Sequence, residues 1–207
     1  MTATELGSRS ATAVLVVGIT YAVVLAIGME QSGLSKPIGD PVLAIMELLT
    51  IASALPLLSL FVALHACAAA AQRIWATLAL CFCAMFAFAT MGVHLVELTA
   101  GRAAGKYGMV WPSVTYAIEL FGWDFLLGLA LLCAAGALPT HKTSNRLRHW
   151  LLVTGALCLA GLIGPLVSNM RLQLIGVFGY AILLPIVAWM LTGWFRAEAR
   201  PQYHPTA

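Results

Sequence analysis

Six long apolar segments make up most of this sequence and limit what it can fold into. A helix that crosses a lipid bilayer needs about 20 mostly apolar residues, and each segment is close to that length or longer. Asp, Glu, Lys and Arg together make up only 9% of the chain, whereas soluble domains have about 25% charged residues. The segments lie near residues 11–29, 42–70, 74–97, 111–138, 149–169 and 172–195.

We therefore predict an all-α fold, a polytopic integral membrane protein in which six transmembrane helices form a bundle. The connections between the apolar segments are short, so neighbouring helices are expected to be antiparallel. No linker is long enough to separate domains, and we predict a single transmembrane domain over residues 1–207. The first segment ends in Gly28-Met29-Glu30 rather than in a small-residue cleavage site, so we interpret it as a retained helix.

The basic residues predict an orientation in the membrane. Six spans place both termini on one side, and Lys and Arg are more frequent in cytoplasmic loops. The terminal side has the larger basic set, which predicts cytoplasmic termini in a bacterial inner membrane. That set is Arg9, Arg73, Lys142, Arg146, Arg148, Arg196 and Arg200, and the opposite set is Lys36, Arg102, Lys106 and Arg171.

Ionisable side chains within the apolar segments are the strongest functional signal. Such groups cost about 2.5–3.5 kcal/mol at a helix centre on insertion scales and usually mark functional sites. The antiparallel arrangement places most of the acids in the non-cytoplasmic half. His94 and Glu97 are three residues apart, and Glu119 and Trp123 are four apart, so each pair shares a helix face.

Asp124 is the most unusual of these acids because it lies about 20 Å below Trp111 at 1.5 Å per residue, near the bilayer midplane. An acid at that depth is expected to keep its proton, and we predict that Asp124 is the acid most important for function.

These residues predict a pocket that opens to the non-cytoplasmic side. We expect the catalytic residues to be Asp124, Glu119, His94, Glu97 and Glu47. We expect the substrate to contact Tyr116, Trp123, Phe121, Asn169, Arg171, Gln173 and Tyr180.

The sequence predicts no metal and no cofactor. His65 and His94 differ in level by about 20 Å, so they cannot bind one haem iron together. No P-loop, nucleophile elbow or dinucleotide fingerprint is present, and no basic and aromatic pattern indicates nucleic acid. Copper(I) is an alternative, because soft thioethers map to the same side as His94: Met29, Met46, Met91, Met109 and Met170.

Three functions remain open. The first is an intramembrane enzyme that transfers protons on a lipophilic substrate, as an isomerase or carbocation cyclase acting on an isoprenoid or sterol-like molecule. Membrane-integral sterol isomerases and terpene cyclases combine acids and aromatic residues in this general way, although no motif is shared. The second is a proton-coupled transporter or small-molecule carrier. The third is a non-catalytic membrane subunit or sensor. The expected partner is a membrane lipid or a lipophilic small molecule; the sequence predicts no oligomeric state.

Overall fold

The computed structural model describes residues 1–33, 36–105, 110–139 and 142–199, without the side chains of residues 142 and 143. All regular secondary structure in these residues is helical, which confirms the predicted all-α fold. Lys106 and Arg200, which contributed to the predicted orientation, and Met109 of the copper alternative lie outside the described residues.

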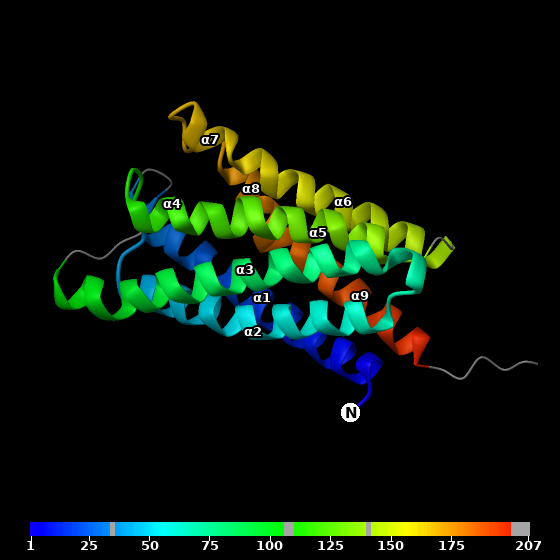
Figure 1. Cartoon of the computed structure of the whole chain (residues 1–207). Helices are drawn as coiled ribbons and strands as arrows, with labels where there is room; N and C mark the ends of the chain where they lie inside the picture. The colour runs from blue at the N-terminus through cyan, green and yellow to red at the C-terminus, as the bar shows by residue number, and fades with distance from the viewer. Residues whose placement is uncertain (34–35, 106–109, 140–141, 200–207) are drawn as a thin grey trace, which may run out of the picture.

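Six helical spans in the described part of the chain are long and apolar enough to cross a membrane, which confirms the six-helix prediction (Figure 1). The first two spans are the single helices α1 (Ala3–Ser32) and α2 (Val42–Cys67). The third consists of η1 (Ala70–Gln72), α3 (Arg73–Val96) and η2 (Glu97–Gly101). The fourth consists of α4 (Val114–Leu120), η3 (Phe121–Leu126) and α5 (Leu127–Ala137). The fifth consists of α6 (Lys142–Gly161) and α7 (Ile163–Leu166), and the sixth of α8 (Leu174–Val177), η4 (Phe178–Leu183) and α9 (Leu184–Glu198).

The first helix starts eight residues before its predicted boundary because a capping box stabilises its N-terminus. The Thr2 side chain accepts a hydrogen bond from the Glu5 backbone N–H, and the Glu5 carboxylate accepts one from the Thr2 N–H. Together these bonds satisfy two backbone donors that a helix end otherwise leaves without partners. The fourth span starts at Val114 rather than near 111, because the Ser113 side chain caps it by accepting a bond from the Tyr116 N–H.

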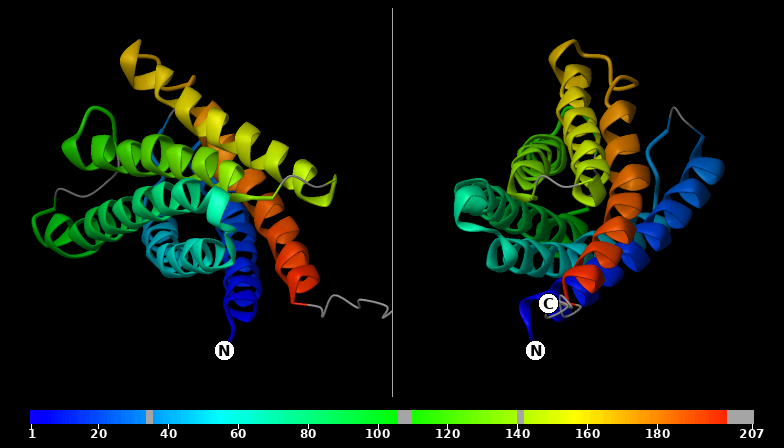
Figure 2. Two further views of the ribbon diagram at one scale, coloured as in Figure 1. Left: turned by 45° about the vertical axis from the view of Figure 1, so that its right-hand side comes forward. Right: turned by 90° about the vertical axis from the view of Figure 1, so that its right-hand side faces the viewer.

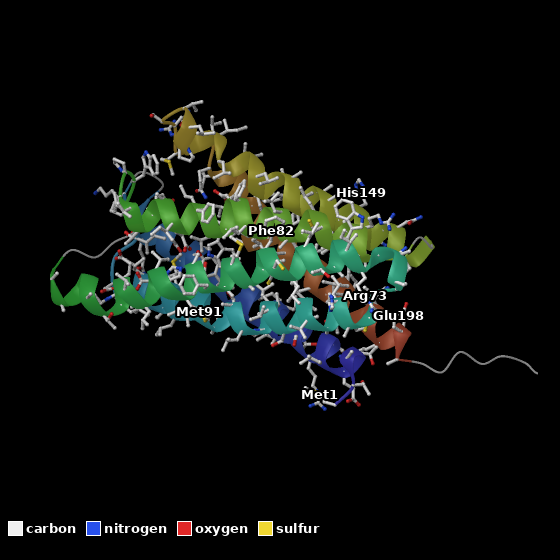
Figure 3. The ribbon with its side chains drawn as sticks, in the orientation of Figure 1. Met1, Arg73, Phe82, Met91, His149 and Glu198 are labelled. Carbon is white, nitrogen blue, oxygen red and sulfur yellow. The ribbon has the colours of Figure 1, made fainter. Side chains whose placement is uncertain are left out.

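The spans pack in chain order around a shared centre. α1 packs on α2, α2 on α3, α3 on α5, α5 on α6, and α6 on α8 and η4, while α9 closes the ring against α1. The right-hand view of Figure 2 looks roughly along the bundle and shows this arrangement. Met1, Arg73, His149 and Glu198 lie toward the same half of the bundle, and Met91 lies toward the other half (Figure 3).

Apolar side chains fill the half of the bundle that contains the termini. Leu57, Phe61, Leu131, Leu151 and Phe195 are each less than 5% exposed there and belong to one continuous core. Large apolar side chains on the outer faces, such as those at positions 16, 23, 55, 88 and 189, are exposed, as expected for helices surrounded by lipid. The polar residues are therefore concentrated in the opposite half.

Candidate functional site

A cavity of about 280 Å³ lies in the half of the bundle opposite the termini. Its walls come from the first, second, third, fourth and sixth spans and from the connection between α1 and α2. Seven of the twelve residues that the sequence predicted for the site line it. They are Glu47, His94, Tyr116, Glu119, Trp123, Gln173 and Tyr180.

His94 and Glu119 form a hydrogen-bonded pair in the cavity wall. The Nε2 atom of His94 lies 3.0 Å from Oε1 of Glu119, and the two side chains are 5% and 16% exposed. This contact joins α3 to α4, and the sequence placed both residues on cavity-facing helix surfaces without pairing them. An imidazole in contact with a carboxylate is a common arrangement for proton transfer, since the carboxylate orients the ring and stabilises its charged form.

Several polar atoms of the cavity residues are buried without a hydrogen-bond partner among the described residues. They are Glu47 Oε1, His94 Nδ1, Glu119 Oε2 and Trp123 Nε1. Each unsatisfied buried group costs about 1–3 kcal/mol. Their concentration in one cavity indicates a place where a bound molecule with polar groups, or water, supplies the partners.

Arg102 holds the outer end of the site together, and the sequence analysis did not assign it a role there. Its Nη1 donates to Glu47 Oε2 over 2.6 Å and to the Glu97 backbone carbonyl over 2.9 Å. Its Nε and Nη2 donate to the two carboxylate oxygens of Asp40 over 3.2 and 2.8 Å. The guanidinium therefore connects the end of the third span to the start of the second.

The Arg102–Asp40 contact also changes the acidity of Asp40. The hydrogen bond from Arg102 is the main cause that lowers the pKa of this loop carboxyl below its ordinary value. Asp40 in turn raises the pKa of the Arg102 guanidinium through the same hydrogen bond. Acidic residues outnumber basic residues among the sequence positions that map to this side of the membrane. That excess was a signal that one of the few basic residues there would form a central ion pair.

Asp124 does not line the cavity but reaches it through other side chains. It is completely buried, and its Oδ2 accepts a bond of 3.4 Å from Gln173 Nε2. The same Gln173 nitrogen donates to the Tyr180 hydroxyl over 3.2 Å, and both of these partners line the cavity. The Asp124 side chain points into the contact between the fourth, fifth and sixth spans and not into the predicted pocket. Its connection to the cavity is therefore indirect.

Four other predicted site residues lie away from the cavity. Glu97 is buried (3% exposed) but is not among the lining residues. Phe121 is 44% exposed on the outer face of η3 and lies beside Phe125. Asn169 and Arg171 are exposed in the turn between the fifth and sixth spans, where the Asn169 side chain accepts a bond from the Arg171 backbone N–H. Phe121 is two residues from Glu119, about 200° around the helix at 100° per residue, so it faces away from the cavity. Asn169 and Arg171 lie in a turn rather than on a helix face.

Three π-helical segments occur at the site, a feature that the sequence analysis did not predict. They are η2, which starts with Glu97, η3, which contains Trp123 and Asp124, and η4, which contains Tyr180. A π-helical turn contains an extra residue, shifts the helix face that follows, and is often found at functional sites. The Trp123 ring lies 5.0 Å from the Tyr180 ring and 4.8 Å from the Phe86 ring, so aromatic rings line the deep end of the cavity.

The copper alternative is only partly consistent with this geometry. Met29 and Met46 line the cavity together with His94. Within the described residues, however, no group of three or more His, Cys, Asp and Glu side chains is arranged to hold a metal ion.

A scan against protein-family models and searches of curated proteins and solved structures found no match to this chain.

Proposed function

We propose that this chain is an intramembrane enzyme that moves a proton on a lipophilic substrate, as an isomerase or cyclase of an isoprenoid or sterol-like molecule. The observation that supports this most directly is the His94–Glu119 pair in the wall of a cavity between the spans. Both residues also have a second polar atom without a partner among the described residues, so each has a site left for contact with a substrate.

The proposed reaction starts with a proton on His94. The His94 imidazolium donates a proton from Nδ1 to one carbon of a substrate double bond, which leaves a carbocation on the adjacent carbon. Glu119 Oε2 then removes a proton from the carbon on the other side, so the double bond shifts and the substrate keeps its composition. Nε2 keeps its proton throughout. The enzyme is restored when Glu119 Oε2 gives its new proton to water and His94 Nδ1 takes one from water, so no proton is gained or lost over the cycle.

The aromatic residues support a cationic intermediate. The faces of Trp, Tyr and Phe rings attract positive charge within about 6 Å, by about 2 kcal/mol or more when water is excluded. Tyr116, Trp123 and Tyr180 all line the cavity. Glu47 also lines the cavity, but its carboxylate is paired with Arg102, so the aromatic rings are the main support for a cation.

A transport function has less support. A transporter needs a polar path through both halves of the membrane, whereas the half that contains the termini is filled by the apolar core around Leu57, Leu131 and Leu191.

A purely structural role for the polar residues also has less support. Such a role would be favoured by hydrogen bonds that satisfy these residues within the protein, and four of the cavity atoms lack such bonds in the described part of the chain.

The test uses exchange of hydrogen with solvent, because it does not require the substrate to be known. The purified protein is reconstituted with a total lipid extract from its host and incubated in D₂O, and each lipid species is then analysed by mass spectrometry. The proposal predicts one lipid that gains deuterium only when active protein is present. His94→Gln and Glu119→Gln should each lower the rate about 100-fold or more, the range that acid–base groups contribute.

The exposed acid Glu30 provides the matched control, and Glu30→Gln should leave the exchange rate unchanged. If no lipid gains deuterium with the wild-type protein, or if both cavity variants keep the full rate, the proposal is rejected.

We also propose that the protein lies in a bacterial inner membrane with cytoplasmic termini, on the basis of the basic residues at that end. Reporter fusions at residues 1 and 207 that are active only in the cytoplasm would support this orientation, and periplasmic activity would reverse it.

A further inference from the structure

A second hollow lies at the opposite end of the molecule, far from the cavity that contains His94. This groove of about 610 Å³ is formed by α6 and α9 near the termini. Arg146 from α6 and Arg196 from α9 are exposed residues in its lining, and Trp189, Gly193 and Trp194 also line it. The groove therefore combines two positive charges with an apolar surface.

The charges in this groove are available to a ligand. Arg146 makes no hydrogen bond or ion pair within the described residues, and Arg196 makes a single hydrogen bond of 3.3 Å, from its Nε to the Ser8 hydroxyl. Glu198, the acid at the end of α9, is not among the lining residues. Two guanidiniums that face one groove without a neutralising carboxylate attract an anion.

The Trp194 indole adds an unsatisfied buried polar group to the wall of the groove. This side chain is only 7% exposed and lines the groove, and its Nε1 has no hydrogen-bond partner among the described residues. A buried N–H is costly without an acceptor. The wall of the groove therefore contains a buried donor that nothing in the described part of the chain satisfies.

The floor of the groove is open at Gly193. A Cβ atom built at this position would meet nothing within 4 Å, so the missing side chain leaves a channel along α9. Trp189 lies one turn deeper and is 64% exposed, as is common for indole rings at the boundary between headgroups and acyl chains. The polar end of the groove thus continues into a surface suited to a hydrocarbon chain.

We infer that this groove binds an anionic phospholipid of the leaflet that the termini face. The phosphate lies between Arg146 and Arg196, and an acyl chain lies over Gly193 along Trp189. Basic pockets between transmembrane helices bind anionic headgroups in this manner. The site is separate from the proposed catalytic cavity and does not depend on the reaction proposed there.

The test measures lipid retention by native mass spectrometry of the full chain in a neutral detergent. Phosphatidylglycerol and phosphatidylcholine with identical acyl chains are titrated separately. The wild-type protein should retain phosphatidylglycerol in preference. Arg146→Gln and Arg196→Gln should each weaken this binding about fivefold, since one basic residue near an anionic lipid contributes about 1 kcal/mol.

Two further variants distinguish specific binding in the groove from general electrostatic attraction between the lipid and the protein surface. Arg9→Gln removes the same charge from an exposed position on α1 at the same end and should leave phosphatidylglycerol binding unchanged. Gly193→Leu keeps every charge but fills the channel, and it should reduce binding at least fivefold. Circular dichroism and thermal unfolding of each variant check that it is folded.

The inference is overturned if Arg9→Gln weakens binding as much as Arg146→Gln, or if folded Gly193→Leu binds normally. It is also overturned if glycerol 3-phosphate at the same concentration displaces the lipid, because the groove would then be a site for a soluble phosphate rather than for a lipid.

Discussion

The Nε2 atom of His94 lies 3.0 Å from Oε1 of Glu119, although the two residues are 25 positions apart in the chain. One comes from the end of α3 and the other from α4, so the bond connects two spans where each contributes a polar residue to the cavity. Both side chains are largely buried. Loss of either partner leaves the other without its hydrogen bond in a place that water reaches poorly.

We therefore expect the effects of His94→Ala and Glu119→Ala on stability to be non-additive. The second substitution should cost less once the first has been made, with a coupling energy of about 0.5–3 kcal/mol, as is usual for directly bonded residues. Unfolding of the two single variants and the double variant in detergent measures this energy. Additive costs would show that the bond is absent in the folded protein.

Arg102 is expected to be more important for stability than any other basic residue on its side of the membrane. Arg102→Met leaves the Glu47 carboxylate, only 1% exposed, without its cation, and breaking a buried pair in this way costs about 3–5 kcal/mol. Adding Glu47→Gln should recover part of the loss, because the unpaired charge is removed. Arg171→Met, at an exposed position on the same side, should have little effect. Thermal unfolding compares the four proteins, and equal losses for Arg102→Met and Arg171→Met would contradict the central role of Arg102.

The Asp40–Arg102 contact predicts a loss of stability in acid. Hydrogen bonding to Arg102 lowers the pKa of Asp40 in the folded protein, whereas the unfolded chain has an ordinary pKa of about 3.9. The contribution of this contact to the free energy of unfolding is therefore fully present above the pKa that Asp40 has in the unfolded chain. It disappears as the pH falls through the lower pKa of Asp40 in the folded protein.

Asp40→Asn tests this pH dependence. The free energy of unfolding should favour the wild-type protein at pH values of about 6, and the difference should shrink toward zero as the pH falls to about 2. A difference that stays constant over this range would show that the carboxylate charge of Asp40 does not contribute.

The sequence predicted the number of spans, the all-helical fold and the half of the bundle that contains the polar residues. These features follow from the length of the apolar segments and from the cost of burying charge, which depend little on packing detail. The same reasoning placed Glu47, His94 and Glu119 in one cavity, because polar groups near one membrane face cannot be satisfied by lipid and are buried inside the bundle.

Other features depend on how neighbouring helices rotate and approach each other. Periodicity of about 3.6 residues per turn could not show that η2, η3 and η4 are π-helical, and each such segment shifts the residues after it to a different face. Asp124, within η3, is in a contact between spans rather than in the cavity. Arg102 was not identified as part of the site because its partner Asp40 is 62 residues away in the chain.

The close contact around Asp124 gives the last prediction. Gly161 on α6 and Gly176 on α8 both lie against the Asp124 carboxyl group, and a Cβ atom at Gly161 would be 2.9 Å from its Oδ1. A Cβ at Gly176 would be still closer to the same atom. Adding a methyl group to such a contact forces the helices apart, which typically costs about 1–3 kcal/mol.

Gly176→Ala should therefore destabilise the protein by about 1–3 kcal/mol, and Asp124→Ala in the same chain should remove part of that cost by creating space for the new methyl group. Gly92→Ala provides the control, because a Cβ there meets nothing within 4 Å and alanine is the better helix former by about 1 kcal/mol. Denaturant unfolding in detergent measures five proteins: the wild type, Gly176→Ala, Asp124→Ala, the double variant and Gly92→Ala. If Gly176→Ala is as harmless as Gly92→Ala, or if its cost is the same with and without the Asp124 side chain, the fifth and sixth spans do not enclose this carboxyl group as the structure shows. A cost that depends on Asp124 would instead establish that this acid is enclosed by the spans around it.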